Sequence, residues 1–249
     1  MLIKNSYYYF QNALSDEVCQ KIIKLGSQNL QPATTMGYNH KQGDVDKKSK
    51  PMSDITYEEL RNEKGISTQD LEKGSFIRDS EAAWLNPQWL YDLVWPYLQK
   101  ANKLSGWEYD FDSAESFQFT KYGKNQFYGW HADGDSDHPG KYKRFIPGVH
   151  KKTEKGRFPY GFTENSNFVG KIRKLSMTIN LNKPGEYEGG NLKFDFGPHA
   201  RGKRFHECEE IRPQGSIIIF PSYIYHQVTP VTKGTRYSLV LWALGKPFK

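Results

Sequence analysis

The sequence predicts a mainly β protein of the α+β class, in which N-terminal helices support an antiparallel sandwich or jelly roll. Three observations lead to this fold class. Residues before 115 contain two stretches with helical periodicity. Residues after 115 contain short β-rich runs bounded by Gly, Pro and Asn, with no long helix between them. Aromatic residues make up 15% of the chain, which favours a β-rich interior.

Two helices are predicted in the N-terminal part. The first begins after Ser15, whose side chain can cap it, and ends at Gly26. The second lies within residues 86–106, and Pro96 is expected to interrupt or kink it. The apolar side chains of both helices are predicted to pack into the core: Val18, Ile22, Ile23, Leu25, Trp89, Leu90, Leu93, Val94 and Leu98.

The β-rich runs are ESFQFTKYG, IRKLSMTINLN, GNLKFDF, GSIIIFPS and TRYSLVLWAL, all after residue 114. Two segments are predicted as loops. Residues 32–56 are polar and rich in lysine. Residues 134–170 show little periodicity and are long for a connection in a compact fold, which is typical of functional or mobile loops. Residues 141–174 carry ten Lys and Arg against two Glu, so we predict that the loop at 134–170 is a mobile, basic cover over a functional site.

The composition is consistent with one domain that covers residues 1–249. The formal charge of +7 permits an acidic partner, either a protein or a nucleic acid. Two cysteines, Cys19 and Cys208, are too few for a disulfide framework and indicate a reducing compartment. The first residues do not resemble a signal peptide, and no apolar run is long enough to cross a bilayer. We therefore expect a cytoplasmic protein with no membrane segment.

A short motif, YGWHADGD at residues 128–135, raises the first functional question. His131 and Asp133 are two positions apart, and residues i and i+2 of an extended chain point to the same side. An imidazole and a carboxylate could therefore meet at one point. Alternatively, Asp133 opens an Asp-Gly turn and His131 merely ends a strand. The H-x-D pattern alone is too short to decide between the two interpretations.

A third candidate ligand, His226, lies in a β-rich stretch that follows GSIIIFPS. In a jelly roll this strand can run beside the strand that ends in H-x-D. His131, Asp133 and His226 would then occupy one face of a metal ion and leave three positions open. This arrangement is typical of non-haem Fe(II) oxygenases, in which the open positions take cosubstrate and oxygen.

Arg236 begins an apolar strand ten residues after His226. An open iron site needs an electron donor, and 2-oxoglutarate can chelate iron through its keto-acid end. Its distal carboxylate would then require a fixed cation, for which the planar guanidinium of arginine is well suited. The alternative is an ordinary arginine on the surface of a strand.

The motif-bearing part of the chain resembles the Fe(II)/2-oxoglutarate dioxygenases, most closely the prolyl 4-hydroxylase-like branch with its small bacterial and phage members. The resemblance rests on His131, Asp133, His226 and Arg236 and on the stretches KYGKNQFYGWHAD and LNKPGEYEGGNLKF. The resemblance extends from about Glu115 to Leu244. It implies a double-stranded β-helix (jelly-roll) catalytic core at 115–249 and mainly helical support at 1–114. The segment FIRDSEAAWL resembles the helical entry segment of those hydroxylases.

The resemblance also implies the chemistry. Fe(II) would be the metal, and 2-oxoglutarate and O2 would be converted to succinate and CO2 as a substrate C–H bond is hydroxylated, with ascorbate as a possible accessory cofactor. Tyr122 matches a tyrosine that borders the cosubstrate, although it could be a core tyrosine. Leu192 and Trp242 match residues that line the barrel. Asn180 stands where some relatives have a cosubstrate-binding tyrosine, so the resemblance implies a cosubstrate contact at this position. Gly189 and Gly190 match a GG turn.

The predicted substrate is a prolyl residue of a peptide or protein, which follows from the resemblance alone, and a free amino acid remains open. Two other functions are considered. A nucleic-acid demethylase of the same superfamily would carry a second arginine where this chain has Trp242. A non-enzymatic jelly-roll binding module would bind no iron. A zinc site built from His199, His206 and Cys208 is also possible, but no second cysteine pair supports it, so a surface turn is preferred.

Overall fold

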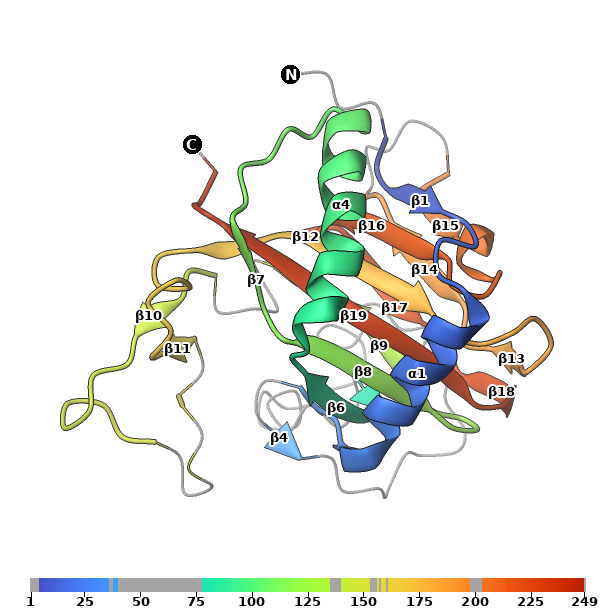
Figure 1. Cartoon of the computed structure of the whole chain (residues 1–249), viewed down its shortest axis with the longest axis horizontal. Helices are drawn as coiled ribbons and strands as arrows, with labels where there is room; N and C mark the ends of the chain where they lie inside the picture. Colours follow the sequence, from blue (N-terminus) through green and yellow to red (C-terminus); the bar gives the residue numbers. More distant parts are fainter. Residues whose placement is uncertain are drawn as a thin grey trace, which may run out of the picture.

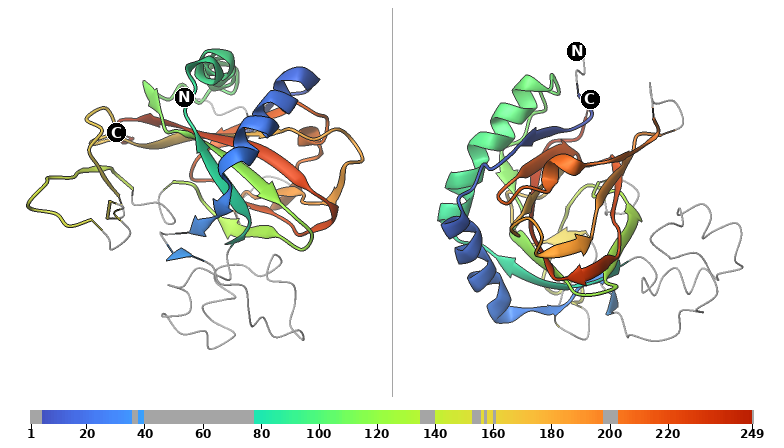
Figure 2. Two further views of the ribbon diagram at one scale, coloured as in Figure 1. Left: turned by 60° about the horizontal axis from the view of Figure 1, so that its bottom comes forward. Right: turned by 90° about the vertical axis from the view of Figure 1, so that its right-hand side faces the viewer.

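Two antiparallel sheets face each other and form the predicted jelly roll (Figures 1 and 2). The computed structural model describes residues 5–35, 38–39, 78–134, 140–152, 156, 158–159, 161–197 and 203–248. All five predicted β-rich runs form strands within these ranges: β8, β12, β14, β16 and β19.

The larger sheet contains eight strands. In spatial order they are β1 (Tyr8–Phe10), β16 (Ile217–Pro221), β12 (Ile172–Asn180), β19 (Arg236–Gly245), β8 (Phe117–Tyr122), β6 (Glu81–Leu85) and β2 (Gln31–Pro32), with β7 (Ser113–Ala114) also paired to β19. The smaller sheet has the order β15 (Phe205–Glu207), β14 (Leu192–Asp195), β17 (Tyr225–Val228), β9 (Phe127–His131) and β5 (Arg78–Asp79).

Three short strand pairs lie outside the two sheets. They are β3 (Thr34–Thr35) with β4 (Tyr38–Asn39), β10 (Lys143–Arg144) with β11 (Phe162–Thr163), and β13 (Tyr187–Gly189) with β18 (Val231–Gly234). Two 3₁₀ turns, η1 (Ser27–Asn29) and η4 (Glu209–Ile211), complete the described elements.

Both predicted helices are present and cover the outer face of the larger sheet (Figure 2). Helix α1 (Asp16–Gly26) begins as predicted, with the Ser15 side chain accepting a hydrogen bond from the N–H of Val18. Helix α4 (Gln88–Leu104) continues through Pro96, so the expected interruption is wrong, whereas the alternative, a kink at Pro96, stays a prediction. Pro96 is exposed, and water can satisfy the carbonyl that its missing N–H leaves free.

The part of the chain before residue 115 also supplies strands. Most of FIRDSEAAWL forms β5 and β6, which corrects the expected helical entry segment. Strand β6 pairs with β8 over five positions, from Glu81 opposite Lys121 to Leu85 opposite Phe117. Ala83 and Leu85 alternate onto the face that packs under the helices, and this period of two favours a strand over a helix.

The main core lies between the helices and the larger sheet. Alternate residues of each strand point into it, such as Phe117 and Phe119 of β8 and Leu239 and Leu241 of β19, and all four are fully buried. The residues between them point to the opposite face, toward the smaller sheet. The space between the two sheets is therefore lined by a separate set of side chains, and the site lies there.

Gly26 ends α1 for a steric reason. Its φ of −69° is ordinary helical backbone, so no left-handed turn requires glycine here. A Cβ at this position would lie 2.2 Å from the Phe119 ring, so glycine allows the helix to approach the sheet.

We therefore expect Gly26→Ala to lower the free energy of unfolding by about 1–3 kcal/mol, which is typical of overpacking. In an unobstructed helix the same change would be stabilising by up to about 1 kcal/mol. Urea denaturation measures the difference. Gly123→Ala is the control, since a Cβ there meets no atom closer than 3.5 Å. Equal stabilities of wild type and Gly26→Ala would contradict this packing.

Three expectations from the sequence concern the cysteines, a membrane segment and a zinc site. Cys19 and Cys208 are both buried and free. No helix in the described ranges combines the length and the apolar composition that a membrane span needs. His206 accepts or donates a hydrogen bond at 2.8 Å with the Tyr7 hydroxyl, and His199 lies outside the described residues.

Candidate active site

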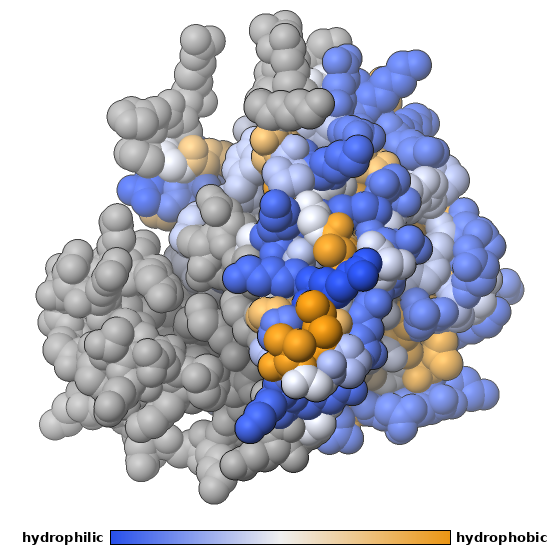
Figure 3. Space-filling view, turned by 90° about the vertical axis from the view of Figure 1, so that its left-hand side faces the viewer, coloured by the Kyte–Doolittle hydropathy of each residue, from blue (hydrophilic) through white to orange (hydrophobic). Residues whose placement is uncertain are grey.

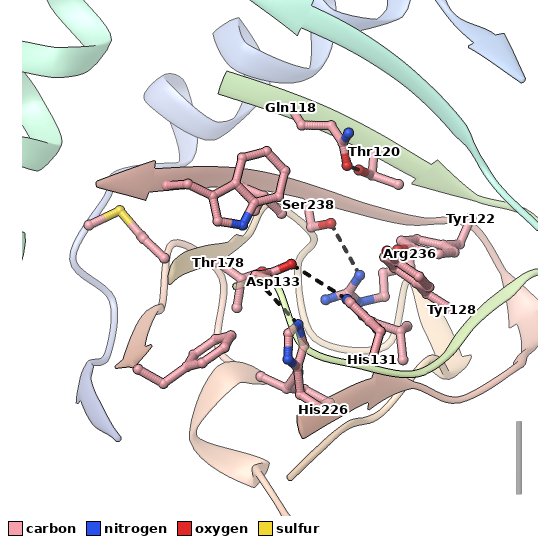
Figure 4. Close-up of a pocket in the computed structure, with 16 residues that line it drawn as sticks. Gln118, Thr120, Tyr122, Tyr128, His131, Asp133, Thr178, His226, Arg236 and Ser238 are labelled. Atoms are coloured by element: carbon pink, nitrogen blue, oxygen red, sulfur yellow. Dashed lines mark hydrogen bonds and ion pairs between the residues drawn. The ribbon is translucent and has the colours of Figure 1, made fainter. Parts of the chain in front are cut away.

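Two side chains of the smaller sheet and one from the turn after β9 meet in a pocket between the two sheets (Figure 4). His131 ends β9 and lies directly opposite His226 of β17. Asp133 follows two residues later. Its two carboxylate oxygens lie 3.6 Å from Nε2 of His131 and 3.5 Å from Nε2 of His226. All three residues are buried, and their ligand atoms lie within 4.8 Å of one another. Among the described residues, no other group could hold a metal in this way.

A β-bulge in β9 aims His131 at the pocket. His226 pairs with His131, and Val228 pairs with Tyr128. The two positions are two residues apart on β17 but three residues apart on β9. The extra residue in β9 makes Tyr128 and His131 share a face, although an odd separation would normally place them on opposite faces. Trp130 points outward instead and packs against Phe205. The bulge therefore brings a second aromatic ring to the metal site.

Hydrogen bonds to backbone carbonyls set the orientation of both imidazoles. Nδ1 of His131 lies 2.8 Å from the Gly129 carbonyl, and Nδ1 of His226 lies 3.0 Å from the Ile224 carbonyl. A carbonyl only accepts hydrogen bonds, so each Nδ1 carries the proton. In the neutral rings Nε2 then presents a lone pair toward Asp133, which is the arrangement that metal-binding histidines use.

The charges at the site fit a cation. Burial would raise the pKa of Asp133, but His226, His131 and Arg173 outweigh it and hold that pKa well below its usual range. Burial, together with the neighbouring His131, lowers the pKa of His226 to about 4. At neutral pH the site therefore offers an ionised carboxylate and a neutral His226 imidazole, both suitable donors to Fe(II).

Arg236 lies in the same pocket, and its side chain is 1% exposed. Nη1 donates to the hydroxyl of Ser238 at 3.2 Å, whereas Nε has no hydrogen-bond partner. The guanidinium also lies 5.3 Å from the centre of the Tyr122 ring. Within the described part of the chain no carboxylate pairs with it. A buried, uncompensated cation is costly, so this guanidinium is suited to an anionic ligand that enters the pocket.

The GG turn at Gly189 and Gly190 leaves room for the side chain of Arg236. Gly190 has a φ of +56°, and a Cβ there would lie 2.9 Å from Cδ of Arg236. Gly189 has a φ of +69°, and a Cβ there would lie 2.2 Å from the Pro230 carbonyl oxygen. Both positions therefore need glycine for their backbone conformation and for close approach.

The pocket contains most of the residues that the sequence analysis selected. Tyr122, Leu192 and Trp242 line it, together with the metal triad and Arg236. Several further lining residues were missed: Gln118, Thr120, Tyr128, Thr178, Val228 and Ser238. Alternation could have identified some of them, because Gln118 and Thr120 precede Tyr122 at intervals of two.

Asn180 is not part of the pocket lining, which corrects its prediction as a cosubstrate contact. It is the next position after Thr178 on the same face of β12, and Thr178 lines the pocket whereas Asn180 does not. Its amide donates instead to the carbonyls of Asn182 and Arg212, at 3.1 and 2.9 Å. These bonds occupy both amide hydrogens, so Asn180 braces the connections at the end of the barrel.

Tyr128 forms a stacked contact with a metal-site residue. Its ring lies 3.5 Å from the ring of His131 and is inclined to it by only 12°. The guanidinium of Arg78 lies 4.6 Å from the centre of the same tyrosine ring. Arg78 is itself buried and donates to Ser80 and Gln118. This arrangement restrains the His131 ring from rotating.

A second arginine supports the other side of the site. Arg173 donates to both carboxylate oxygens of Glu115, at 2.5 and 2.7 Å, and to the backbone carbonyl of Asp133 at 3.1 Å. It also lies 3.8 Å from the centre of the Trp242 ring. Burial would lower the pKa of Arg173, but Glu115 outweighs it and raises that pKa. One largely buried ion pair thus braces both the loop of a candidate ligand and the wall of the pocket.

We expect Glu115→Gln to lower the free energy of unfolding by about 3 kcal/mol, the lower end for breaking a buried ion pair. The largely buried Arg173 guanidinium loses its hydrogen-bonded carboxylate and keeps only the more distant charge of Asp133. Glu188→Gln is the matched control, since its exposed pair with Lys233 should contribute less than about 1 kcal/mol. Denaturant unfolding of both variants tests this. Similar small effects would show that the Arg173 pair contributes no more than a surface pair.

None of the described residues of 140–170 lines the pocket, so the predicted cover over the active site stays a prediction. In Figure 1 this segment, with β10 and β11, projects to the side of the barrel. Ile146 and Val149 are 44% and 70% exposed there. The face on this side of the molecule shows a small hydrophobic area bordered by hydrophilic surface (Figure 3).

The jelly roll and its buried pair of histidines with one carboxylate define the class of non-haem iron oxygenases. Comparison with known proteins agrees. The sequence profile of the 2OG-Fe(II) oxygenase superfamily matches residues 117–244, about half of the chain. The chain belongs to this superfamily and is an enzyme of its kind. Such enzymes use Fe(II), 2-oxoglutarate and O2, and the triad in the pocket fits the iron.

Several relatives are more specific. The chain is 40% identical over 93 residues to a PKHD-type hydroxylase of Prochlorococcus marinus, a match that covers 36% of this chain and 38% of the relative. It is 41% identical over 68 residues to a PKHD-type hydroxylase of Nitrobacter winogradskyi, which covers 27% of each. These matches span between a quarter and two fifths of the relatives' own lengths.

Two solved structures share the fold. The viral collagen prolyl hydroxylase of Paramecium Bursaria Chlorella virus-1, in its 2OG complex, superposes with a TM-score of 0.53 at 17% identity over 97% of both chains. A Pseudomonas putida prolyl-4-hydroxylase superposes with a TM-score of 0.51 at 15% identity, over 97% of this chain and 94% of that one. At this identity the likeness establishes the jelly-roll fold alone.

Proposed function

We propose that this enzyme hydroxylates a prolyl residue of a peptide or protein. His131, Asp133 and His226 hold Fe(II), and Arg236 binds the distal carboxylate of 2-oxoglutarate. One observation carries the assignment of these roles: a buried triad of metal-ligand type shares its pocket with a buried arginine that has no acidic partner.

When bound, iron and 2-oxoglutarate supply an oxidative decarboxylation, in which O2 and 2-oxoglutarate yield succinate and CO2 and one oxygen atom enters a substrate C–H bond. The protein contributes orientation and charge. The Gly129 and Ile224 carbonyls fix the two imidazoles, and Tyr128 packs on the face of His131. Ser238 and Tyr122 hold the guanidinium of Arg236 in place.

Hydroxylation is supported by the relatives described as PKHD-type hydroxylases, and the choice of a prolyl residue follows the prolyl hydroxylases that share the fold. A nucleic-acid substrate is less well supported, since Trp242, which lines the pocket, stands where the base-repair relatives carry an arginine. Use of ascorbate and a cytoplasmic location stay predictions.

A succinate-release assay tests the substrate class. The panel contains proline-containing peptides, free proline and methylated oligonucleotides, and mass spectrometry detects the gain of one oxygen atom. We expect hydroxylated peptides. Turnover that depends on an oligonucleotide, with no product from any proline substrate, would establish the nucleic-acid activity instead.

A further inference from the structure

The pocket is longer than the cosubstrate needs. Four successive inward positions of β19 line it: Arg236, Ser238, Val240 and Trp242. At about 3.3 Å per residue, Arg236 and Trp242 are about 20 Å apart along the strand. A five-carbon diacid anchored at Arg236 therefore leaves the Trp242 end free, and the substrate is expected there.

An exposed tryptophan extends this end of the pocket. Trp84 of β6 pairs with Gln118 of β8, and both point to the face of the larger sheet that lines the pocket. Ala83 and Leu85 point into the core on the other face. Trp84 is 59% exposed, and its ring centre lies 6.1 Å from that of Trp242. The sheet therefore presents a largely open indole beside the pocket.

The two indoles form a rigid surface. β6 is paired with β8 over its whole length, which fixes the backbone of Trp84. Arg173 packs on the ring of Trp242 and is itself held by Glu115. Rigid aromatic surfaces gain binding area at a small cost in conformational entropy.

Trp242 also has an unused donor. The residue is 5% exposed, and its buried Nε1 has no hydrogen-bond partner. A buried donor without a partner is costly, and a ligand carbonyl could satisfy it. The subsite thus combines an apolar aromatic face with a single N–H donor at the inner end.

We propose that Trp84 and Trp242 form the subsite for the peptide segment next to the reacting residue, and that its occupant is an extended, proline-containing segment. This inference rests on the proposed function. In a polyproline II conformation the rings are exposed and the carbonyls make no internal hydrogen bonds. A proline ring then packs on Trp84 while a neighbouring carbonyl accepts from Nε1 of Trp242, as in aromatic-lined grooves that bind proline-rich peptides.

Steady-state kinetics of the full chain test the subsite. Three substrates are compared: a peptide whose reacting proline is flanked by proline, the same peptide with flanking alanine, and N-acetyl-prolinamide. For the proline-flanked peptide, Trp84→Ala is expected to raise KM about tenfold, more than it lowers kcat, and Trp84→Phe should recover most of the loss. The KM of N-acetyl-prolinamide, which has no flanking residue, should change far less.

Tyr9→Ala is the matched control, because Tyr9 is a 45% exposed aromatic residue on β1, at the far edge of the same sheet. It should leave every KM unchanged. If wild type hydroxylates the peptides and Trp84→Ala retains their KM, or raises the KM of all three substrates equally, the subsite is overturned and the proposed function stands. If wild type hydroxylates no proline substrate, or if only oligonucleotides depend on Trp84, both are overturned.

Discussion

His226→Ala is expected to abolish turnover and to weaken Fe(II) binding by at least about 100-fold. Loss of a hydrogen bond that only supports a metal ligand already weakens metal binding by up to about 100-fold, and the loss of a ligand should cost at least as much. The physical reason is that the variant removes one of three ligand atoms that lie within 4.8 Å of one another. The fold should survive, since the main core lies on the other side of the larger sheet.

Anaerobic Fe(II) titration measures the affinity, and thermal unfolding provides a readout that needs no turnover. A metal that binds the native state raises the midpoint of unfolding, so Mn(II) should stabilise wild type but not the variant. His206→Ala is the control, since His206 lies on β15, outside both the pocket and the 134–170 segment. Unchanged metal stoichiometry and activity in His226→Ala would remove this residue from the site.

Arg236→Leu is expected to weaken 2-oxoglutarate binding by about 100-fold or more, with little change in metal affinity. Removing one partner of a buried ion pair costs about 3–5 kcal/mol, and each 1.4 kcal/mol corresponds to a factor of about ten. Arg236→Lys should lie between wild type and Leu, because an ammonium keeps the charge but cannot form two parallel hydrogen bonds to a carboxylate.

Calorimetry with Mn(II) in place of Fe(II) measures cosubstrate binding without turnover. The expected order of affinity is wild type, Arg236→Lys, then Arg236→Leu. Lys193→Leu is a suitable control, since its surface pair with Glu207 lies outside the pocket. Equal 2-oxoglutarate affinity in Arg236→Leu and wild type would show that the cosubstrate carboxylate lies elsewhere, although the metal triad could still stand.

Local patterns in the sequence predicted the strands of the jelly roll, and together with the family resemblance they selected the residues of the candidate site. The period of two in β8 and β19 determines which residues leave the main core, and it places Tyr122 and Arg236 in the pocket. The N-cap at Ser15 determines where α1 begins. These features depend on residues only a few positions apart, so short-range patterns in the sequence can predict them.

Only the tertiary structure showed how strands far apart in sequence register against each other. The bulge that turns Tyr128 and His131 to one face exists because β9 pairs with β17, about a hundred residues away. The supporting contacts are equally distant: Arg173 reaches Glu115, and Trp84 lies against Trp242. Asn180 has the correct alternation but lies beyond the pocket, where backbone carbonyls occupy its amide. Alternation along one strand determines the face on which a side chain lies, whereas its neighbours depend on strand register and burial that only the closed barrel decides.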